Sequence, residues 1–179
     1  MDSYLMNRSD SLLLVIDIQD RLMPAIAVGD DVVLNANRLI EAARLLSVPA
    51  VVTEQNPEKL GATVSQLDIS GLPLVKKMTF DSCPAAGFND ALSGDKSLIV
   101  IGCEAHVCVL QTVMGLLARN RKVFVVEDAV GSRTADNKQA ALSRMARQGA
   151  EIVTTEMVAF EWLASAEDPD FKKVISLIK

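Results

Sequence analysis

The sequence contains Leu12-Leu13-Leu14-Val15-Ile16, an unbroken apolar run that ends directly at the acidic residue Asp17. A short apolar run without alternating polar residues is typical of a β-strand that is buried on both faces, as in a parallel sheet. Runs of the same kind recur along the chain, at residues 50–52, 74–75, 98–101, 123–126 and 152–153. The sequence therefore predicts a central, mostly parallel sheet of about six strands.

Amphipathic stretches separate these runs and predict helices. The clearest one places six apolar residues on one helix face: Val32, Ala36, Leu39, Ile40, Ala43 and Leu46. Residues 109–117 and 141–145 repeat the pattern, and Gly149 is a suitable helix stop. Alternation of strands and helices predicts right-handed crossovers with helices on both sheet faces. We expect a doubly wound, three-layer α/β/α sandwich, with residues 1–179 forming a single α/β domain.

Composition excludes several classes of protein. The 18 basic and 23 acidic residues give a net charge of −5, which disfavours a nucleic-acid partner because such binding needs a basic face. No apolar run approaches the roughly 20 residues of a membrane span, and the first residues lack the pattern of a secretory signal. Three cysteines are too few for a disulfide scaffold, so we expect free thiols and a cytoplasmic location.

Ligands of such sheets bind at the carboxyl ends of the strands, so the polar residues that follow the apolar runs are the candidate site. Asp17 follows the first run, residues 53–55 the second and Lys77 the third. Residues 102–108 follow the fourth run, and residues 127–128 the fifth. An acid, a lysine and a cysteine are thus predicted to meet at one edge.

Cys108 is the candidate nucleophile of this edge. It stands where a helix is predicted to begin, and the positive end of a helix dipole favours a thiolate. A nucleophilic cysteine needs a base, for which Asp17 is suited, and Lys77 would stabilise the developing negative charge. Each residue also has a simpler interpretation: Cys108 as a small buried residue, Asp17 as a capping residue and Lys77 as a solvated strand end.

Three segments together resemble a known family. Leu13-Leu14-Val15-Ile16-Asp17-Ile18-Gln19, Lys77-Met78-Thr79-Phe80 and Gly102-Cys103-Glu104-Ala105-His106-Val107-Cys108-Val109 are similar to the three motifs of the isochorismatase-like cysteine hydrolases. The likeness continues through residues 126–133 to residues 154–157, nearly the whole chain. The third motif is the most specific of them, and it is similar to that of the small isochorismatase-domain proteins.

The resemblance implies a catalytic triad of Asp17 as base, Lys77, and Cys108 as nucleophile. It also implies a cis peptide bond between Cys103 and Glu104. The backbone N–H groups of Glu104 and Cys108 would then form an oxyanion hole. These roles are expectations that come from the family.

The sequence departs from two branches of this family. Isochorismatases proper hydrolyse a vinyl ether and lack the nucleophilic cysteine, so Cys108 favours acyl chemistry on an amide, ureide or related C–N bond. Nicotinamidases add a metal held by Asp and His residues, but His106 is the only histidine here. We therefore expect a hydrolase of a small-molecule substrate that needs no metal and no other cofactor.

Four further residues are weaker candidates for the substrate pocket: Gln19, Glu54, Phe80 and His106. Each has an equally good structural interpretation, as a capping, solvated, core or turn residue. We expect Cys83 to be an inert buried thiol. Residues 56–71 have no clear period and predict a loop that reaches over the site.

Two other functions remain open at this point. The chain could be a binding or scaffold protein that retains a hydrolase fold, or a redox sensor that pairs Cys108 with Cys103, although the five-residue separation makes a bridge geometrically doubtful. Half of the residues are apolar, which predicts a homo-oligomer. The expected contacts are a C-terminal helix within residues 169–179 that carries Phe171, and the surface around Met157, Phe160 and Trp162. The helix could instead dock on the body of the domain, and Trp162 could belong to the core.

Overall fold

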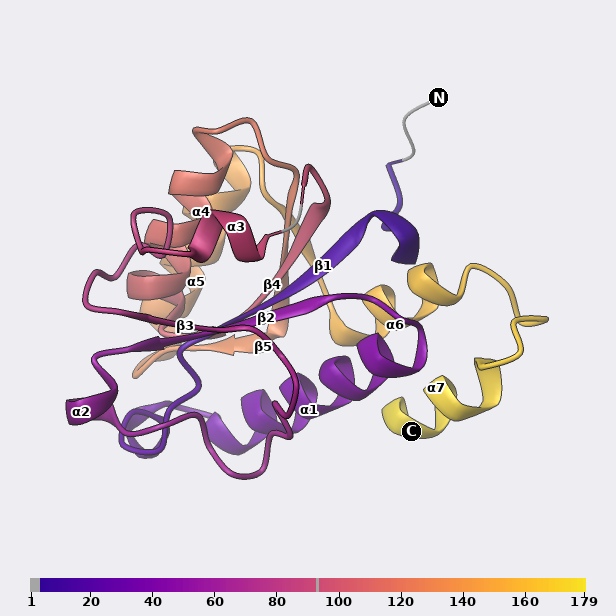
Figure 1. Ribbon diagram of the computed structural model, residues 1–179, viewed down its shortest axis with the longest axis horizontal. Helices are drawn as coiled ribbons and strands as arrows, with labels where there is room; N and C mark the ends of the chain where they lie inside the picture. The colour runs from indigo at the N-terminus through magenta and orange to yellow at the C-terminus, as the bar shows by residue number, and fades with distance from the viewer. Residues whose placement is uncertain (1–3, 93) are drawn as a thin grey trace.

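The computed structural model describes residues 4–92 and 94–179, and their strands form one six-stranded parallel sheet (Figure 1). Its order is β3-β2-β1-β4-β5-β6. The strands are β1 Ser11–Ile16, β2 Ala50–Gln55, β3 Leu74–Lys77, β4 Ser97–Cys103, β5 Val123–Gly131 and β6 Glu151–Val153. Every predicted apolar run lies in one of them, and all neighbouring pairs are parallel. The expected parallel sheet is confirmed.

Burial explains why the apolar runs are unbroken. Every residue of β1 and of β4 is buried, and the two strands pair in register from Ser11 with Ser97 to Ile16 with Gly102. A strand with helices on both sides has no face on which a polar residue would be solvated. β1 and β4, which are buried along their whole length, are therefore the centre of the sheet.

Helices cover both faces of the sheet, as Figure 1 shows. One face carries α1 (Gly29–Leu45), α6 (Thr155–Leu163) and α7 (Phe171–Ile178), which share one apolar core. The opposite face carries α3 (Phe88–Ala91), α4 (Leu110–Leu117) and α5 (Ala135–Arg147), which share the other. The three-layer sandwich is thus confirmed. The helices of the described residues include none that is long and apolar enough to cross a lipid bilayer.

The strand order reverses between β1 and β4. The chain proceeds outward from β1 to β2 and β3, then returns and proceeds the other way from β4 to β5 and β6. A crevice opens at such a reversal, outside the carboxyl ends of the two strands, and ligands of doubly wound sheets bind there. Asp17 follows β1 and Glu104 follows β4, so the predicted site residues flank the reversal.

Gly102 permits the close approach of these two strands. Its φ is +125°, and a Cβ atom at this position would lie 1.9 Å from the carbonyl oxygen of Ile16. No side chain fits at that distance, so β4 can reach the end of β1 only with glycine here.

The fifth strand is longer than its apolar run predicts. We expected Glu127 and Asp128 to follow it, but β5 continues through both of them to Gly131, with an irregularity in its pairing with β4. The Asp128 carboxylate accepts from the backbone N–H and the hydroxyl of Thr155, at 2.8 and 2.9 Å. The prediction was wrong because these two polar residues belong to an irregular part of the strand, where Asp128 holds the start of α6.

The segment 56–71 contains the short helix α2 (Pro57–Leu60) and a single antiparallel bridge between Gln19 and Thr63. Its later residues turn toward the α1 face, where Val64 and Leu67 are buried. Arg44 of α1 holds this part by donating to Asp68, at 2.6 Å from both the carboxylate and the carbonyl oxygen. The segment is the predicted loop, but its apolar side chains anchor it beside α1.

The C-terminal helix is present as α7, and its apolar side faces inward. Val174 is fully buried, and Phe171, Ile175 and Ile178 pack against the core between α1 and α6. Trp162 is also buried, and its indole N–H donates to the Ser11 hydroxyl over 3.0 Å. The sequence left open whether this helix and Trp162 contact the body of the domain or a partner subunit. They pack within the chain, because the short helices α6 and α7 bury their apolar faces against α1.

Candidate functional site

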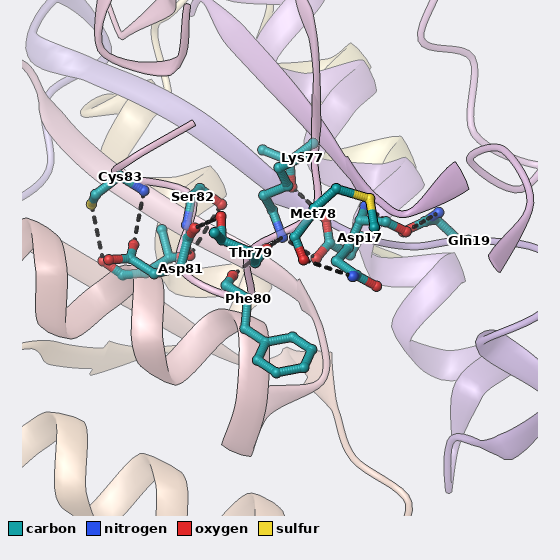
Figure 2. A network of polar contacts seen from close by, with 12 residues as sticks. Asp17, Gln19, Lys77, Met78, Thr79, Phe80, Asp81, Ser82 and Cys83 are labelled. Atoms are coloured by element: carbon teal, nitrogen blue, oxygen red, sulfur yellow. Dashed lines mark hydrogen bonds and ion pairs between the residues drawn. The ribbon is translucent and has the colours of Figure 1, made fainter. Parts of the chain in front are cut away.

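The site begins with a buried ion pair between Asp17 and Lys77. The Lys77 ammonium donates to the Asp17 carboxylate over 2.6 Å, and both side chains are fully buried. The same ammonium also donates to the carbonyl oxygens of Thr79 and Phe80, each at 3.2 Å. Figure 2 shows the ammonium between the carboxylate and the loop that follows β3. Three acceptors satisfy the three N–H bonds of the ammonium, which compensates for its removal from water.

Thr53 fixes the second oxygen of the Asp17 carboxylate. Its hydroxyl, on the neighbouring strand β2, donates to Oδ1 of Asp17 over 2.6 Å. Asp17 itself has a φ of +50°, and its backbone N–H donates to the Thr53 carbonyl. The turn at the end of β1 therefore holds the carboxylate in one orientation, between Thr53 on one oxygen and Lys77 on the other.

Cys108 lies in a helical segment that begins earlier than predicted. A π-helical turn, η3 (Ala105–Val109), precedes α4, and the carbonyl oxygen of Glu104 accepts from the backbone N–H groups of Val107 and Val109. Cys108 is therefore the fourth residue of the helical segment, and it is only 6% exposed. It is buried within the core on the α4 side of the sheet.

The environment of Cys108 favours the neutral thiol in the resting protein. Burial, the negative charge of Asp17 and a hydrogen bond to its carboxylate raise the pKa of the Cys108 thiol well above its ordinary value. The Lys77 ammonium and the backbone N–H of Glu104 act in the opposite direction but do not prevail. The helix dipole alone predicted a thiolate. The structure differs because desolvation and the adjacent carboxylate outweigh it.

This arrangement can move a proton. The Asp17 carboxylate binds the Lys77 ammonium and lies close enough to Cys108 to raise the pKa of its thiol, so it can accept the thiol proton as the sulfur attacks a substrate. The resulting thiolate would lie beside the ammonium, which favours negative charge there. The structure thus brings together the three residues that the sequence singled out.

Glu104 follows β4 and precedes the turn that carries Cys108, and the peptide bond between Cys103 and Glu104 is cis, as the resemblance implies. Its backbone N–H acts on the Cys108 thiol and favours the thiolate. Its side chain is buried and pairs with Arg133: Nη2 donates over 2.8 Å, and Nε lies 3.0 and 3.1 Å from the two carboxylate oxygens. Burial disfavours the charged form of Glu104, but the guanidinium holds the pKa of this carboxyl below its usual value.

Two of the weaker pocket candidates have structural partners. The Gln19 amide donates to the carbonyl oxygens of Gln55 and Gly61, at 3.1 and 2.7 Å, and accepts from the Gln55 N–H. Glu54 accepts from the N–H and hydroxyl of Thr63, at 2.7 and 2.9 Å. Side chains alternate along a strand, so Glu54 points to the face opposite Thr53 and away from Asp17. Both residues hold the segment after β2 in place.

The other two candidates, His106 and Phe80, are at least partly exposed to solvent. His106, two residues before Cys108, is half-buried, and its Nδ1 lies 3.0 Å from the Ser132 hydroxyl. Phe80 is 49% exposed, and in Figure 2 its ring points away from the contact between Asp17 and Lys77. The neighbouring Met78 is 69% exposed. Phe80 and Met78 therefore present apolar surface next to the loop that holds the Lys77 ammonium.

Cys83 is buried, and burial together with the negative charge of Asp81 raises the pKa of its thiol to about 12. Burial likewise raises the pKa of Cys103 to about 12. All three cysteines are free. No group of three acidic, cysteine or histidine side chains gathers as a metal site among the residues that the structure describes.

Sequence reasoning did not assign roles to three residues that organise the site: Thr53, Thr112 and Arg133. Thr112 lies one turn after Cys108, and its hydroxyl accepts from the Ser82 N–H over 3.0 Å, which ties the loop after Lys77 to α4. The position of Thr53 at the end of an apolar run was a usable signal. Nothing in the sequence pairs Arg133 with Glu104, which lies 29 positions earlier.

Comparisons with known proteins agree with the fold and the motifs. The family model "Isochorismatase domain" matches residues 11–157. The isochorismatase domain-containing protein 2A of Mus musculus is 38% identical over 170 residues, which cover 94% of this chain and 82% of that protein. The isochorismatase domain-containing protein 1 of Danio rerio is also 38% identical, but the chain spans only 61% of its length.

A solved structure from Caenorhabditis elegans, described as a MAR1 ribonuclease, has the same fold. It superimposes with a TM-score of 0.93 at 37% identity, over 97% of this chain and 92% of that one. The match of the family model covers most of the chain, and the mouse relative is matched over most of its own length. The chain therefore belongs to the isochorismatase domain family.

Proposed function

We propose that this protein is a cofactor-independent hydrolase that cleaves a C–N bond, in an amide, ureide or related group, through a thioester on Cys108. The observation that carries the proposal is that one buried carboxylate, Asp17, pairs with the Lys77 ammonium and lies close enough to Cys108 to raise the pKa of its thiol. A nucleophile, a base and a charge-stabilising group in mutual contact are what covalent acyl transfer requires. A binding protein has no need of all three.

The first half of the reaction transfers the acyl group to sulfur. Asp17 takes the proton of the Cys108 thiol as the sulfur attacks the substrate carbonyl carbon, and a C–S bond forms. The backbone N–H groups of Glu104 and Cys108 are the proposed donors to the oxyanion. The C–N bond then breaks, and the leaving nitrogen takes the proton from Asp17. The products of this half are an amine and a thioester.

The second half releases the acid. Asp17 accepts a proton from a water molecule as the water oxygen attacks the thioester carbonyl carbon. The C–S bond breaks, and the sulfur leaves as a thiolate beside the Lys77 ammonium. The proton on Asp17 returns to Cys108. The neutral resting thiol fits this scheme, since its proton moves only when a substrate is attacked.

The charges near Cys108 suggest the kind of substrate. Two acids lie beside it, and each is matched by a base: Asp17 by Lys77 and Glu104 by Arg133. Each charged side chain of the site already has an oppositely charged partner, so none is free to pair with a charged substrate. An uncharged substrate therefore fits the site best. Exposed Met78 and Phe80 next to the loop after β3 favour an apolar group on that substrate.

Ribonuclease activity is the function named for the Caenorhabditis elegans relative. For this chain we favour a small molecule, because the net charge is −5 and RNA binding depends on basic surface. A redox sensor that pairs Cys108 with Cys103 is also less favoured. Cys103 is fully buried, and its pKa of about 12 leaves almost no thiolate to form a disulfide. We further propose that the protein acts in the cytoplasm as a homo-oligomer.

Mass spectrometry of trapped protein tests the proposal. The protein is incubated with a panel of uncharged amides and ureides, quenched in acid and digested, and the Cys108 peptide is searched for acyl adducts. An adduct whose mass equals the acyl part of a substrate, together with release of the amine, is the expected result. The Cys83→Ala variant should give the same adduct. Turnover without any adduct on Cys108, or cleavage of RNA that survives in Cys108→Ala, would contradict the proposal.

A further inference from the structure

Glu104 contributes three separate groups to the surroundings of the nucleophile. Its backbone N–H acts on the Cys108 thiol and favours the thiolate. Its carbonyl oxygen accepts from the N–H groups of Val107 and Val109, at 3.0 and 3.2 Å, and so closes the turn that carries Cys108. Its carboxylate leads away from the sulfur to Arg133. Any rotation of this one residue would therefore move both the donor at the sulfur and the turn that holds the sulfur.

The contact with Arg133 has the geometry of a clamp. Nε of Arg133 approaches both carboxylate oxygens, at 3.0 and 3.1 Å, and Nη2 donates to Oε1 over 2.8 Å. The backbone N–H of Arg133 approaches Oε2 at 3.3 Å. A guanidinium that binds a carboxylate through two of its nitrogens fixes direction as well as distance. The side chain of Glu104 therefore has little rotational freedom.

The exposure of the two partners is unequal. The Glu104 side chain is 5% exposed, whereas that of Arg133 is 63% exposed. Arg133 lies between the end of β5 at Gly131 and the start of α5 at Ala135, so its side chain contributes little to the packing of the core. A buried carboxylate whose partner is removed must turn toward water or take up a proton. Either response would release the Glu104 backbone from its present position.

We propose that Arg133 is a positioning residue, which acts through the Glu104 carboxylate to hold the Glu104 N–H against the Cys108 sulfur and the oxyanion that forms there. Arg133 itself does not touch the reacting atoms in this scheme. The inference rests on the proposed function, in which Cys108 is the nucleophile. Its direct consequence concerns the reactivity of Cys108, which is measurable without a substrate.

The ion pair between Arg8 and Asp168 provides a matched control. It has the same length, 2.8 Å, and likewise joins a partly exposed arginine to a carboxylate that is only 6% exposed. It lies between the N-terminal segment and the segment before α7. Arg8→Ala therefore removes an equivalent ion pair that has no connection with Cys108.

The experiment compares Arg133→Ala with Arg8→Ala by three measurements: the pH dependence of Cys108 alkylation by iodoacetamide, kcat and KM for a substrate found with the amide panel, and melting temperature. For Arg133→Ala we expect alkylation to need higher pH, because the N–H that favours the thiolate is no longer held in place. We also expect kcat to fall about tenfold or more with KM nearly unchanged, since an oxyanion donor acts mainly in the transition state. Arg8→Ala should leave the pH dependence of alkylation and the kinetic constants as in the wild type.

Rescue by a free cation distinguishes positioning from general damage. Guanidinium chloride at millimolar concentration should restore alkylation and kcat of Arg133→Ala, whereas sodium chloride at equal ionic strength should not. Arg133→Lys keeps the positive charge but loses the guanidinium group that binds the carboxylate through two nitrogens, so it should recover only part of the activity. An unchanged alkylation profile in Arg133→Ala overturns the inference, as does an equal effect of Arg8→Ala. If no amide is turned over by the wild type, the proposed function fails, while the alkylation measurement still decides the role of Arg133.

Discussion

The Lys77 ammonium and the Asp17 carboxylate meet at 2.6 Å at the point where the strand order reverses, and neither side chain is exposed to solvent. A buried pair of this kind is stable only while both partners are present, because each charge would otherwise lack compensation. The pair also flanks Cys108, whose thiol pKa the carboxylate raises and the ammonium lowers. Substitution of either partner should therefore change stability and thiol reactivity in ways that can be separated.

Lys77→Met keeps the size of the side chain and removes its charge. We expect the rate of hydrolysis to fall by about 10²-fold or more, because the cation beside the thiolate is lost. Alkylation of Cys108 by iodoacetamide should also shift to higher pH, since the ammonium is a group that lowers the thiol pKa. The uncompensated Asp17 should destabilise the fold by about 3–5 kcal/mol, measured by urea unfolding. An unchanged alkylation profile would mean that Lys77 does not act on the sulfur.

Asp17→Asn should shift the alkylation of Cys108 to lower pH, opposite to the shift expected for Lys77→Met. The carboxylate raises the thiol pKa both through its charge and through its hydrogen bond, so its removal makes the thiolate accessible at lower pH. Hydrolysis should nevertheless be lost, because no base remains to carry the proton between sulfur, leaving group and water. Faster alkylation combined with lost turnover is a result that simple misfolding does not produce. Slower alkylation would contradict the assigned contact.

Cys108→Ala should abolish hydrolysis and leave the fold intact, because one small side chain carries the covalent step. Cys83→Ala is its matched control, since Cys83 is also buried and its thiol, with a pKa of about 12, is almost entirely neutral at pH 7. That variant should retain most of the activity. The assay measures release of the amine, and circular dichroism checks the fold. If Cys83→Ala is inactive and Cys108→Ala is active, the nucleophile is misassigned.

The sequence could predict the sheet because its strands are buried on both faces. Six apolar runs gave six strands, and the first and fourth runs became the fully buried centre, β1 and β4. The same logic located Asp17, Lys77 and Cys108, since parallel strands bring their carboxyl ends to one edge. The apolar runs predicted the strand ends too early where polar residues continue the strand, as residues 53–55 do in β2, Lys77 in β3 and Asp128 in β5.

The supporting contacts of the site could not be predicted from the sequence, and the reason is physical. Thr53 acts through one hydrogen bond and Arg133 through an ion pair, to partners 36 and 29 positions away, and such contacts leave no periodic pattern. The sequence left open, for a related reason, whether Phe171 and Trp162 pack inside the chain or against a partner subunit. An apolar face on a short helix is the same in sequence whether a second subunit or the chain itself covers it.

Removal of metal should have no effect. Dialysis against EDTA should leave activity and melting temperature unchanged, because the proposed mechanism moves its proton through Asp17 and needs no Lewis acid. The control is the same dialysis without chelator, followed by addition of zinc to both samples. Activity that is lost with EDTA and restored by zinc would show that a metal takes part in the reaction.

The homo-oligomer proposal now rests on only part of the surface that the sequence indicated, the exposed residues Met157 and Phe160. Phe171 and Trp162 pack inside the chain, but Met157 and Phe160 of α6 are 44% and 45% exposed, and Leu5 beside them is 64% exposed. Leu5 and Phe160 line one hollow between the N-terminal segment and α6. A stable interface buries about 800 Å² on each partner, so an apolar hollow of this kind would form only part of it.

Light scattering at micromolar concentration tests the proposal, because the chain has a mass of 19.3 kDa and any assembly is a multiple of it. Phe160→Asp should lower the measured mass, since a charge cannot be buried unpaired in a contact. Leu34→Asp is the matched control, on a residue of α1 that is 50% exposed and distant from α6 in sequence. A wild-type mass near that of one chain rejects the oligomer. A multiple that survives Phe160→Asp but not Leu34→Asp would place the contact on α1 instead.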